Sequence, residues 1–538
     1  MATDDTNSLI EQRKAKLAAL RAKGIDPFKN KFKPSEKCKE AHDNYVEGRE
    51  VAVAGRIGAH RDMGKSMFID VRDQSGRIQV YAQKNVLGDE QFDIFRHLDL
   101  GDFIGARGAL FTTKTGEISV KLASFVILAK ALRPPPEKWH GLADTEIRYR
   151  QRYLDLIGNP EVKEVFLKRS AIVHEIRQFF HGRGYVEVET PAMQAIPGGA
   201  AAQPFKTFHN ALGCDFYLRI ALELYHKRLL VGGIDKLFEI GKNFRNEGLS
   251  RRHNPEFTML EAYCAFGDYE SMMETVEALI TGVAEKVLGT LVFEHNPAKG
   301  STGDSPVPPG NLPGGTGGAP PAEWGVPLAA NTSPIPVGES PIGTGGSPVP
   351  PIPSVSAKVI NLTRPWKRAR YKDLVKEKAG ADWFDISPAE RRQRAHDIGV
   401  EIGKEYEDFE VTGAVFEKLI EPTLIQPTFV THLPKELVPL AKLSPDDPTT
   451  VEVFECCING QEIAPGYTEQ NDPIAQRNTL EHQAGGEQQK LDEDFLVALE
   501  HGMPPAGGIG IGIDRLCMML LGQESIRDVI LFPQLKPK

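Results

Sequence analysis

The sequence predicts an α+β protein in which a small β-barrel precedes a larger domain of mixed helices and strands. Residues 51–130 contain five short runs that alternate apolar and polar side chains, with turn residues about every ten positions. From about residue 145 onward, helical and strand patterns are mixed. With 538 residues, 41% of them hydrophobic and 25% charged, the chain has a globular composition, which excludes fibrous, collagen-like and wholly disordered proteins.

The first element is basic. Between residues 11 and 40 there are ten Lys and Arg residues against four Asp and Glu residues, and Leu9, Leu17 and Leu20 follow helical spacing. A solvated surface helix and a basic arm that lies on a phosphate backbone both fit this pattern. We therefore expect a basic helical arm over residues 1–48.

The second element is the barrel, which we place at residues 49–132. Five short strands in about 80 residues favour the oligonucleotide-binding (OB) barrel, the commonest module of this kind. Pro134–Pro136 then indicates a stiff connector.

The third element, residues 133–538, is interrupted at residues 297–356. This interruption has 15 Pro and 12 Gly among its 60 residues. Such a composition cannot bury enough apolar surface to offset chain entropy, so we expect a disordered, looped-out insertion. Because the motifs flank it, its deletion is expected to leave activity within a few-fold.

Composition excludes further classes. Six cysteines without a Cys-x-x-Cys spacing indicate neither a disulfide-rich scaffold nor a zinc site. The polar start MATDDTNS is unlike a secretory signal, and no run reaches the ~18 apolar residues of a membrane span. The net charge of −9 argues against nonspecific DNA binding. We expect a cytoplasmic protein that binds neither membrane nor DNA.

Three segments carry chemistry, and the first is FRNEGLSRRHNPEFTMLEAYCAF, from Phe244 to Phe266. Its second half alternates as a strand does, which puts Phe257, Glu261 and Tyr263 on one face. An aromatic ring, a carboxylate and a phenol are poor core material, so this face is expected to line a ligand site. The loop before it is suited to wrapping phosphates, and a charged surface hairpin is the alternative interpretation.

The second segment is EVFECCINGQEIAPGYTEQND. Asn459-Gly460 between apolar runs predicts a two-residue hairpin turn. This turn puts Glu455 and Glu462 on one face as diagonal neighbours, ~7–8 Å apart at the backbone, close enough to share one Mg²⁺ ion. A pair of solvated hairpin carboxylates is the alternative interpretation.

The third segment is GGIGIGIDRLCMMLLG. One strand face is bare because glycines alternate along it, at positions 508, 510 and 512. Asp514 is predicted to cap the following helix, which puts Arg515 in the first turn. An Arg beside a bare strand face is suited to stacking on a purine and reaching a phosphate.

Together these segments resemble the class II aminoacyl-tRNA synthetases. FRNEG…RHNPEF…E-x-Y is similar to motif 2 of that family, GIGIDR to motif 3 and VEVETPAM to motif 1. The strings IPGGAAAQPF, YLRIALELYHKRLLVGG, RHNPEFTMLEAY and IRDVILFP resemble the lysine-specific enzymes of the bacterial type. The resemblance covers nearly the whole chain except the insertion, and it implies an antiparallel-sheet catalytic domain.

The resemblance also implies a reaction and its partners. L-lysine and ATP would give lysyl-adenylate and diphosphate, and lysine would then pass to the 3′-terminal ribose of tRNA(Lys). Mg²⁺ would be the cofactor, and a homodimer the assembly. Because an α-carboxyl group of pKa ~3.5 is already ionised at neutral pH, the first step needs no general base. Alignment and charge stabilisation by Arg245, Arg515 and Mg²⁺ would carry it.

The resemblance implies these site residues, position by position. The catalytic pair is Arg245 and Arg515. The ATP site comprises Arg245, Glu247, His253, Asn254, Phe257, Glu455 and Arg515. The lysine site comprises Gly199, Glu223, Glu261, Tyr263, Tyr467 and Glu469, with Glu223 near the α-amino group. The metal ligands are Glu455 and Glu462, and the anticodon-binding residues of the barrel are Arg61, Phe68, Gln79 and Glu117.

This sequence departs from the family pattern at two places. Pro465 stands where the family usually has an Asn that touches the lysine side chain, and Gln470 replaces a Leu. The loss of that Asn removes one polar contact around the substrate ammonium group.

Three alternatives remain open at the level of sequence. Phe68 could be a core residue of the barrel instead of a base-stacking one. A lysyl-transferase that acts on a protein would share the catalytic motifs but lack the barrel, against which residues 51–130 speak. A non-catalytic relative would have lost motif residues such as Arg245 and Arg515, and both are present.

Overall fold

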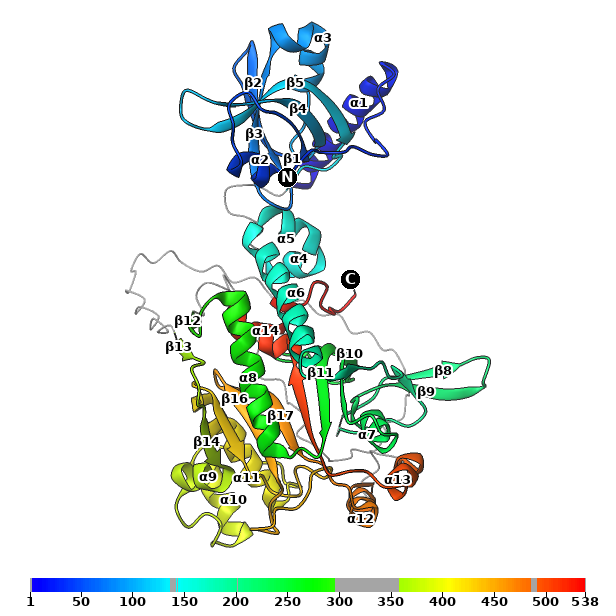
Figure 1. The fold of residues 1–538 in the computed structure, drawn as a ribbon, viewed down its shortest axis with the longest axis vertical. Helices are drawn as coiled ribbons and strands as arrows, with labels where there is room; N and C mark the ends of the chain where they lie inside the picture. The colour runs from blue at the N-terminus through cyan, green and yellow to red at the C-terminus, as the bar shows by residue number, and fades with distance from the viewer. Residues whose placement is uncertain are drawn as a thin grey trace, which may run out of the picture. The chain divides into compact units, whose positions relative to one another are not determined.

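The computed structural model describes residues 2–135, 142, 144–200, 202–295, 358–484 and 491–537 (Figure 1). The chain divides into two compact units, Met1–Leu142 with Tyr153–Asn159, and Ala143–Arg152 with Pro160–Lys538. The insertion expected at residues 297–356 lies outside the described residues. None of the described helices combines the length and the apolar character that crossing a membrane requires.

The first unit contains a closed five-stranded barrel, which confirms the prediction from the alternating runs. The strands close in the order β1-β2-β3-β5-β4. In β2, Met67, Ile69 and Val71 are fully buried in the barrel core, because alternate side chains of a strand point to the same face. The strands are β1 (Glu50–Asp62), β2 (Ser66–Arg72), β3 (Arg77–Gln83), β4 (Phe103–Thr112) and β5 (Ile118–Ala129), with helix α3 (Lys84–Arg96) between β3 and β4.

The basic N-terminal segment forms helix α1 (Ala2–Ala22), followed by α2 (Cys38–Asp43). Arg13 Nη1 donates to two backbone carbonyls of the segment after β5, at 2.8 and 3.0 Å. Lys16 Nζ lies 2.6 Å from a carboxylate oxygen of Asp99. Part of the positive charge of α1 is therefore used within the unit, on the side of the helix that packs against the barrel.

The second unit is built on an eight-stranded sheet with the order β14-β15-β16-β17-β18-β11-β10-β6. All neighbouring strands are antiparallel except the two outermost pairs, β14 with β15 and β10 with β6. The strands are β6 (Val186–Glu187), β10 (Lys236–Phe244), β11 (Glu256–Ala265), β14 (Lys367–Arg370), β15 (Thr428–Thr431), β16 (Val453–Ile458), β17 (Gln461–Thr468) and β18 (Ala506–Gly512).

Helices α6 (Pro160–His181), α8 (Tyr269–Leu288) and α14 (Ile513–Leu521) share one core with this sheet (Figure 1). Leu260 and Ala262 of β11 are fully buried in that core. Strand alternation therefore directs the residues between them to the opposite face of the sheet. That opposite face carries the predicted site.

Smaller elements flank the sheet. Strands β12 (Val292–His295) and β13 (Lys358–Asn361) pair so that His295 lies opposite Lys358, on either side of the insertion. The other elements of the second unit are α4 (Thr145–Arg150), β7 (Met193–Gln194), β8 (Lys206–His209), β9 (Cys214–Leu218), α7 (Glu223–Val231), α9 (Tyr371–Ala379), α10 (Pro388–Asp397), α11 (Asp408–Val415), the short π-helix η2 (Phe416–Ile420), the 3-10 helix η3 (Glu421–Thr423), α12 (Pro473–Ala484), α13 (Glu493–Glu500) and α15 (Ile526–Val529). Helix α5 (Arg152–Gly158) belongs, from Tyr153 on, to the first unit.

Candidate active site

The site face of the sheet is bare where β18 crosses it. Gly508 and Gly510 of β18 lie opposite Tyr263 and Glu261 of β11. A Cβ atom on Gly508 would overlap the carboxylate of Glu469 and come within 2.7 Å of the Tyr263 ring. The glycines are required because side chains from both neighbouring strands lie across them.

Three buried carboxylates surround this bare face. Glu223 begins α7, Glu261 lies in β11, and Glu469 follows β17. Tyr467 Oη donates to Glu223 Oε1 at 2.6 Å, and Tyr263 Oη donates to Glu261 Oε2 at 3.1 Å. The structure thus brings together side chains from three separate parts of the sequence.

Gly199 belongs to the same pocket. Its φ of 86° is a left-handed conformation that favours glycine. A Cβ atom there would lie 3.1 Å from Ala221 and 3.4 Å from the Cβ of Glu223. The structure therefore brings all six residues predicted for the lysine site close together.

The pocket also contains a lysine of the chain itself, which sequence reasoning missed. The Lys227 Nζ atom lies 2.7 Å from Glu223 Oε1 and 2.6 Å from Glu469 Oε2, and its side chain is fully buried. Burial alone would lower the pKa of Lys227, but the two carboxylates outweigh it and raise that pKa. The i,i+4 spacing of Glu223 and Lys227 is the local signal that could have indicated this pair.

Negative charge in the pocket exceeds positive charge. Burial raises the pKa of Glu261, and burial also raises that of Glu469 although Lys227 opposes the shift. Glu469 Oε1 has no hydrogen-bond partner within the described part of the chain. An unpartnered buried carboxylate oxygen is costly, so the pocket is suited to a ligand that brings ammonium groups.

Two arginines lie on the other side of the site. Arg515 Nη1 is 3.4 Å from Glu462 Oε2, and its Nη2 is 3.3 Å from His253 Nε2. The Arg245 Cζ atom lies 5.2 Å from the centroid of the Phe257 ring. The buried Nε of Arg245 has no hydrogen-bond partner among the residues that the structure describes. Both guanidinium groups are thus placed to hold an anion.

The loop between β10 and β11 carries the other residues predicted for ATP. Desolvation, and then the charges of Arg515, Arg245 and Arg252, lower the pKa of His253 to about 4, so the ring is neutral at pH 7. Asn254 is buried and its Nδ2 donates to the carbonyl oxygen of Glu256 at 2.6 Å.

Glu247 is exposed on the same loop. Burial lowers the pKa of Arg245, and the negative charge of Glu247 opposes that shift. Glu247 is thus near enough to Arg245 to affect its charge, as expected of two residues of one site.

The turn of the carboxylate hairpin forms where the sequence predicts it, but the register beyond the first pairs differs from the regular hairpin that was expected. Asn459 and Gly460 have φ values of 58° and 72°, and Cys457 lies opposite Glu462. A β-bulge between Cys456 and Cys457 then shifts the register, so that Glu455 lies opposite Pro465.

The hairpin carboxylates have two acidic neighbours that sequence reasoning missed. Burial, and then the charges of Glu462, Glu421 and Glu417, raises the pKa of Glu455. Glu421 Oε1 accepts the backbone N–H of Glu462 at 2.8 Å. Glu417 and Glu421 lie in η2 and η3, and no local pattern links those turns to the hairpin. In the described ranges no three His, Cys, Asp or Glu side chains are grouped so as to hold a metal ion.

The prediction that Asp514 caps the last sheet-covering helix is wrong. Helix α14 begins at Ile513 with Gly512 as its N-cap. Asp514 Oδ2 accepts the backbone N–H of Thr258 at 2.7 Å, and Oδ1 lies 2.7 Å from Arg169. Asp514 therefore ties α14 to β11 and positions the neighbouring Arg515.

Pro465, the departure from the family pattern, has a structural position that suits proline. The pairing of β17 with β18 runs over Gly466, Tyr467 and Thr468. Pro465 has no N–H to donate, and it stands next to the place where this ladder ends.

On the barrel, Phe68 is half-buried and lies outside the barrel core. It is opposite Arg61 of β1, and its ring stacks on Tyr81 with centroids 4.6 Å apart. Tyr81 in turn lies 5.6 Å from the Phe111 ring. Sequence reasoning missed Tyr81 and Phe111, although both fall on predicted strands. The structure therefore shows a row of three rings instead of a single one.

The other two barrel residues are held by neighbours. Gln79 is 7% exposed, and its Oε1 accepts a hydrogen bond from Ser119 Oγ at 3.0 Å. The Glu117 Oε1 atom lies 3.1 Å from Arg77 Nη2. Arg77 also lies 3.4 Å from Asp70, which is opposite Gln79 in the barrel. All four predicted residues thus fall on or beside four adjoining strands, β1, β2, β3 and β5.

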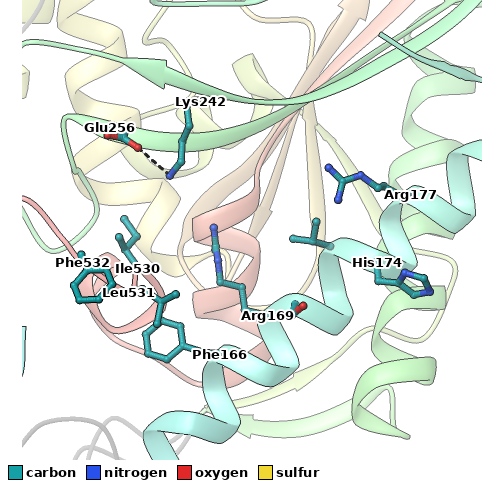
Figure 2. A pocket seen from close by; sticks show the side chains of 11 residues that line it. Phe166, Arg169, His174, Arg177, Lys242, Glu256, Ile530, Leu531 and Phe532 are labelled. Carbon is teal, nitrogen blue, oxygen red and sulfur yellow. Dashed lines mark ion pairs between the residues drawn. The ribbon is translucent and has the colours of Figure 1, made fainter. Parts of the chain in front are cut away.

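A separate cavity of about 680 Å³ lies among α6, the β10 and β11 ends and the C-terminal segment (Figure 2). Its lining includes Phe166, Arg169 and Phe532, and Lys242 lies 3.5 Å from Glu256 there. None of the residues predicted for the site lines it. Arg169 connects it to the site only indirectly, through Asp514.

Comparison with known proteins agrees with this geometry. Residues 144–536 match the family described as tRNA synthetases class II (D, K and N), and residues 51–128 match the OB-fold nucleic acid binding domain. A lysine–tRNA ligase of Carboxydothermus hydrogenoformans is 46% identical over 100% of both chains. One of Pelotomaculum thermopropionicum is 45% identical over 99% of this chain and 96% of its own. One of Bacillus subtilis is 42% identical over 99% and 98%. The chain therefore belongs to the class II tRNA synthetases, and within them to the lysine–tRNA ligase family.

Proposed function

We propose that this protein is a lysine–tRNA ligase of translation. It activates L-lysine with ATP to lysyl-adenylate and diphosphate, and it transfers lysine to the 3′-terminal ribose of tRNA(Lys). The observation that carries the choice of lysine is the buried pocket in which three carboxylates face one fixed ammonium group. A substrate with two ammonium groups supplies the missing positive charge, whereas a neutral amino acid leaves buried carboxylates unpaired.

In the first step, a carboxylate oxygen of lysine attacks the α-phosphorus of ATP, and the bond from that phosphorus to diphosphate breaks. No proton moves, because the carboxylate is already ionised at neutral pH. Arg245 holds the lysine carboxylate and the α-phosphate together, and Phe257 and Arg515 enclose the adenine. The unpartnered Nε of Arg245 and its position over the Phe257 ring support these roles.

Glu455 and Glu462 would hold Mg²⁺ together with phosphate oxygens of ATP. The raised pKa of Glu455 reflects burial among carboxylates, and such a donor set suits a hard cation. When bound, the ion would neutralise charge on the phosphates of ATP. His253, Asn254 and Glu247 complete the nucleotide site in this proposal.

In the second step, a ribose hydroxyl of the tRNA attacks the carbonyl carbon of the adenylate, and the bond to AMP breaks. We propose that the barrel holds the anticodon through Arg61, Phe68, Gln79 and Glu117. We also propose that the enzyme works as a homodimer in the cytoplasm. Its parts are an N-terminal arm (1–48), an OB barrel (49–132) and a catalytic domain (133–538).

Pyrophosphate exchange tests the first step. ATP–pyrophosphate exchange is measured with each standard amino acid in turn, with ATP and Mg²⁺ present. We expect exchange with lysine and only background with the others. Exchange that is absent with lysine in well-folded protein, or equal for a neutral amino acid, contradicts the proposal.

Glu469→Gln tests the pocket. The change removes one charge that faces the substrate, and hydrogen bonds to charged groups contribute ~1.5–3 kcal/mol. The KM for lysine is expected to rise by about one to two orders of magnitude, with the KM for ATP little changed. Initial rates of exchange at varied lysine and ATP give both constants. An unaltered lysine KM would place Glu469 outside the pocket.

Phe68→Ala tests the barrel. Stacking on a base contributes ~1–3 kcal/mol, so tRNA charging is expected to fall at least several-fold. Lysine-dependent exchange without tRNA should stay near the wild-type rate. Exposed Met63, in the turn between β1 and β2, gives a matched control as Met63→Ala. If exchange and the melting temperature fell along with charging, Phe68 would be a structural residue.

A further inference from the structure

The buried side chain of Lys227 carries an inference that rests on the proposed function and goes beyond it. We propose that Lys227 is a positioning residue of the lysine pocket, which orients Glu223 and Glu469 and fixes the charge that the substrate must match.

The ammonium group of Lys227 joins three segments that are distant in the sequence. It contacts Glu223 on its own helix α7, Glu469 after β17, and the carbonyl oxygen of Leu440, which accepts a hydrogen bond at 3.3 Å. The contact with Leu440 is a hydrogen bond, and the contacts with the two carboxylates are ion pairs. The side chain is fully buried, so Lys227 is part of the pocket wall.

Lys227 holds Glu469 through one of its two oxygens. Glu469 Oε2 is 2.6 Å from Lys227 Nζ, and Oε1 lies over Gly508. Apart from this ion pair, neither oxygen of Glu469 has a hydrogen-bond partner within the described ranges. Glu223 Oε1 contacts both Lys227 Nζ and the hydroxyl of Tyr467. One ammonium group therefore fixes two carboxylates from separate segments.

Lys227 also sets the charge of the pocket. The charged and titratable groups beside it are Glu223 from α7 and Glu469 and Tyr467 from the β17 segment. Glu261 and Tyr263 of β11 lie next to those carboxylates, and His226 Nδ1 is 3.8 Å from Glu261 Oε2. Lys227 lies beside two of the three carboxylates, Glu223 and Glu469, so it offsets part of their negative charge. Burial raises the pKa of Glu469 to about 8 although Lys227 opposes the shift, so the loss of Lys227 is expected to raise that pKa further.

The test uses the full-length protein and the variant Lys227→Met, whose unbranched side chain is one atom shorter than that of lysine and carries no charge. Lysine-dependent pyrophosphate exchange is measured between about pH 7 and 8.5, with KM values for lysine and ATP determined separately. We expect the lysine KM to rise about tenfold or more at the lower pH, with the ATP KM within about twofold of wild type. The ratio of kcat/KM for lysine between wild type and variant should change over this pH range, because the loss of Lys227 changes the pKa of the carboxylates that it contacts.

Arg228→Met is the matched control. Arg228 follows Lys227 on the same helix but pairs with Asp492 and Asp494, outside the pocket. It should leave both KM values near wild type. If Lys227→Met leaves the lysine KM unchanged, or raises both KM values equally with no dependence on pH, the positioning role is overturned.

Lys227→Met could fail to fold, and the double variant Lys227→Met/Glu469→Gln then keeps the test decisive. It removes both partners of one ion pair, so no buried charge of that pair is left uncompensated. In the double variant, kcat/KM for lysine should no longer vary with pH through the titration of Glu469. A pH profile of kcat/KM that equals the wild-type profile contradicts the role. Wild-type protein without lysine-dependent exchange would instead overturn the proposed function, so the two failures are distinguishable.

Discussion

Arg245→Met is expected to lower lysine-dependent pyrophosphate exchange by about two to three orders of magnitude in kcat, because one group that contacts both reactants is lost. Arg245 is partly buried beside Phe257, and its buried Nε lacks a partner among the described residues. The guanidinium charge of Arg245 stabilises the transition state of the reaction more than it stabilises the bound substrates. Exchange kinetics at saturating lysine and ATP measure this effect.

Arg251→Met is the control for this variant, because Arg251 is exposed on the same loop. It should exchange pyrophosphate at nearly the wild-type rate. A folded Arg245→Met protein whose kcat remains near wild type would remove Arg245 from the reaction, whatever its effect on KM.

Gly508→Ala is expected to raise the KM for lysine by about two orders of magnitude or more. The added methyl group would overlap Glu469 and press on the Tyr263 ring. Displacement of Glu469 and Tyr263 would weaken two interactions with the bound lysine. A hydrogen bond to a charged group contributes ~1.5–3 kcal/mol. Exchange assays at varied lysine and ATP should show that the loss is concentrated in the lysine KM.

Gly282→Ala controls for the effect of adding a methyl group to a glycine. Gly282 lies inside α8, and no atom is within 4 Å of a Cβ built there. Alanine has a higher helix propensity than glycine, so the Gly282→Ala protein should be active and at least as stable as the wild type. Gly508→Ala protein with a normal lysine KM would show that the bare strand face does not border the substrate.

Much of the fold follows from local patterns. The alternating runs predict the barrel strands, and Asn459-Gly460 predicts the hairpin turn, because two adjacent residues with positive φ specify that turn. The face of β11 on which Glu261 lies can also be predicted from the sequence, because successive side chains of a strand point to opposite faces of the sheet. The family resemblance, in contrast, supplied the roles of Glu223 and Glu469, which no local pattern connects.

What the sequence did not predict depends on contacts between distant segments. Lys227 meets Glu469 only because α7 and the end of β17 come together in space. Glu421 approaches the hairpin from another part of the chain, where nothing local indicates a partner. The sequence does not distinguish an aspartate that caps a helix from one that lies in its first turn. The position of Asp514 is recognisable only from its hydrogen bond with Thr258, a residue distant in the sequence.

The pairing of β12 with β13 has a consequence for how the domain could be divided. His295 and Lys358 lie opposite each other, so the chain leaves and re-enters the fold at neighbouring points. The piece before this junction supplies Arg245 and β11, and the piece after it supplies Arg515 and β18, which pairs directly with β11. Neither piece holds a complete site. Two separately expressed fragments, split at this junction, would therefore regain activity when they associate and β11 pairs with β18. The activity of the enzyme would then report the association of the two fragments.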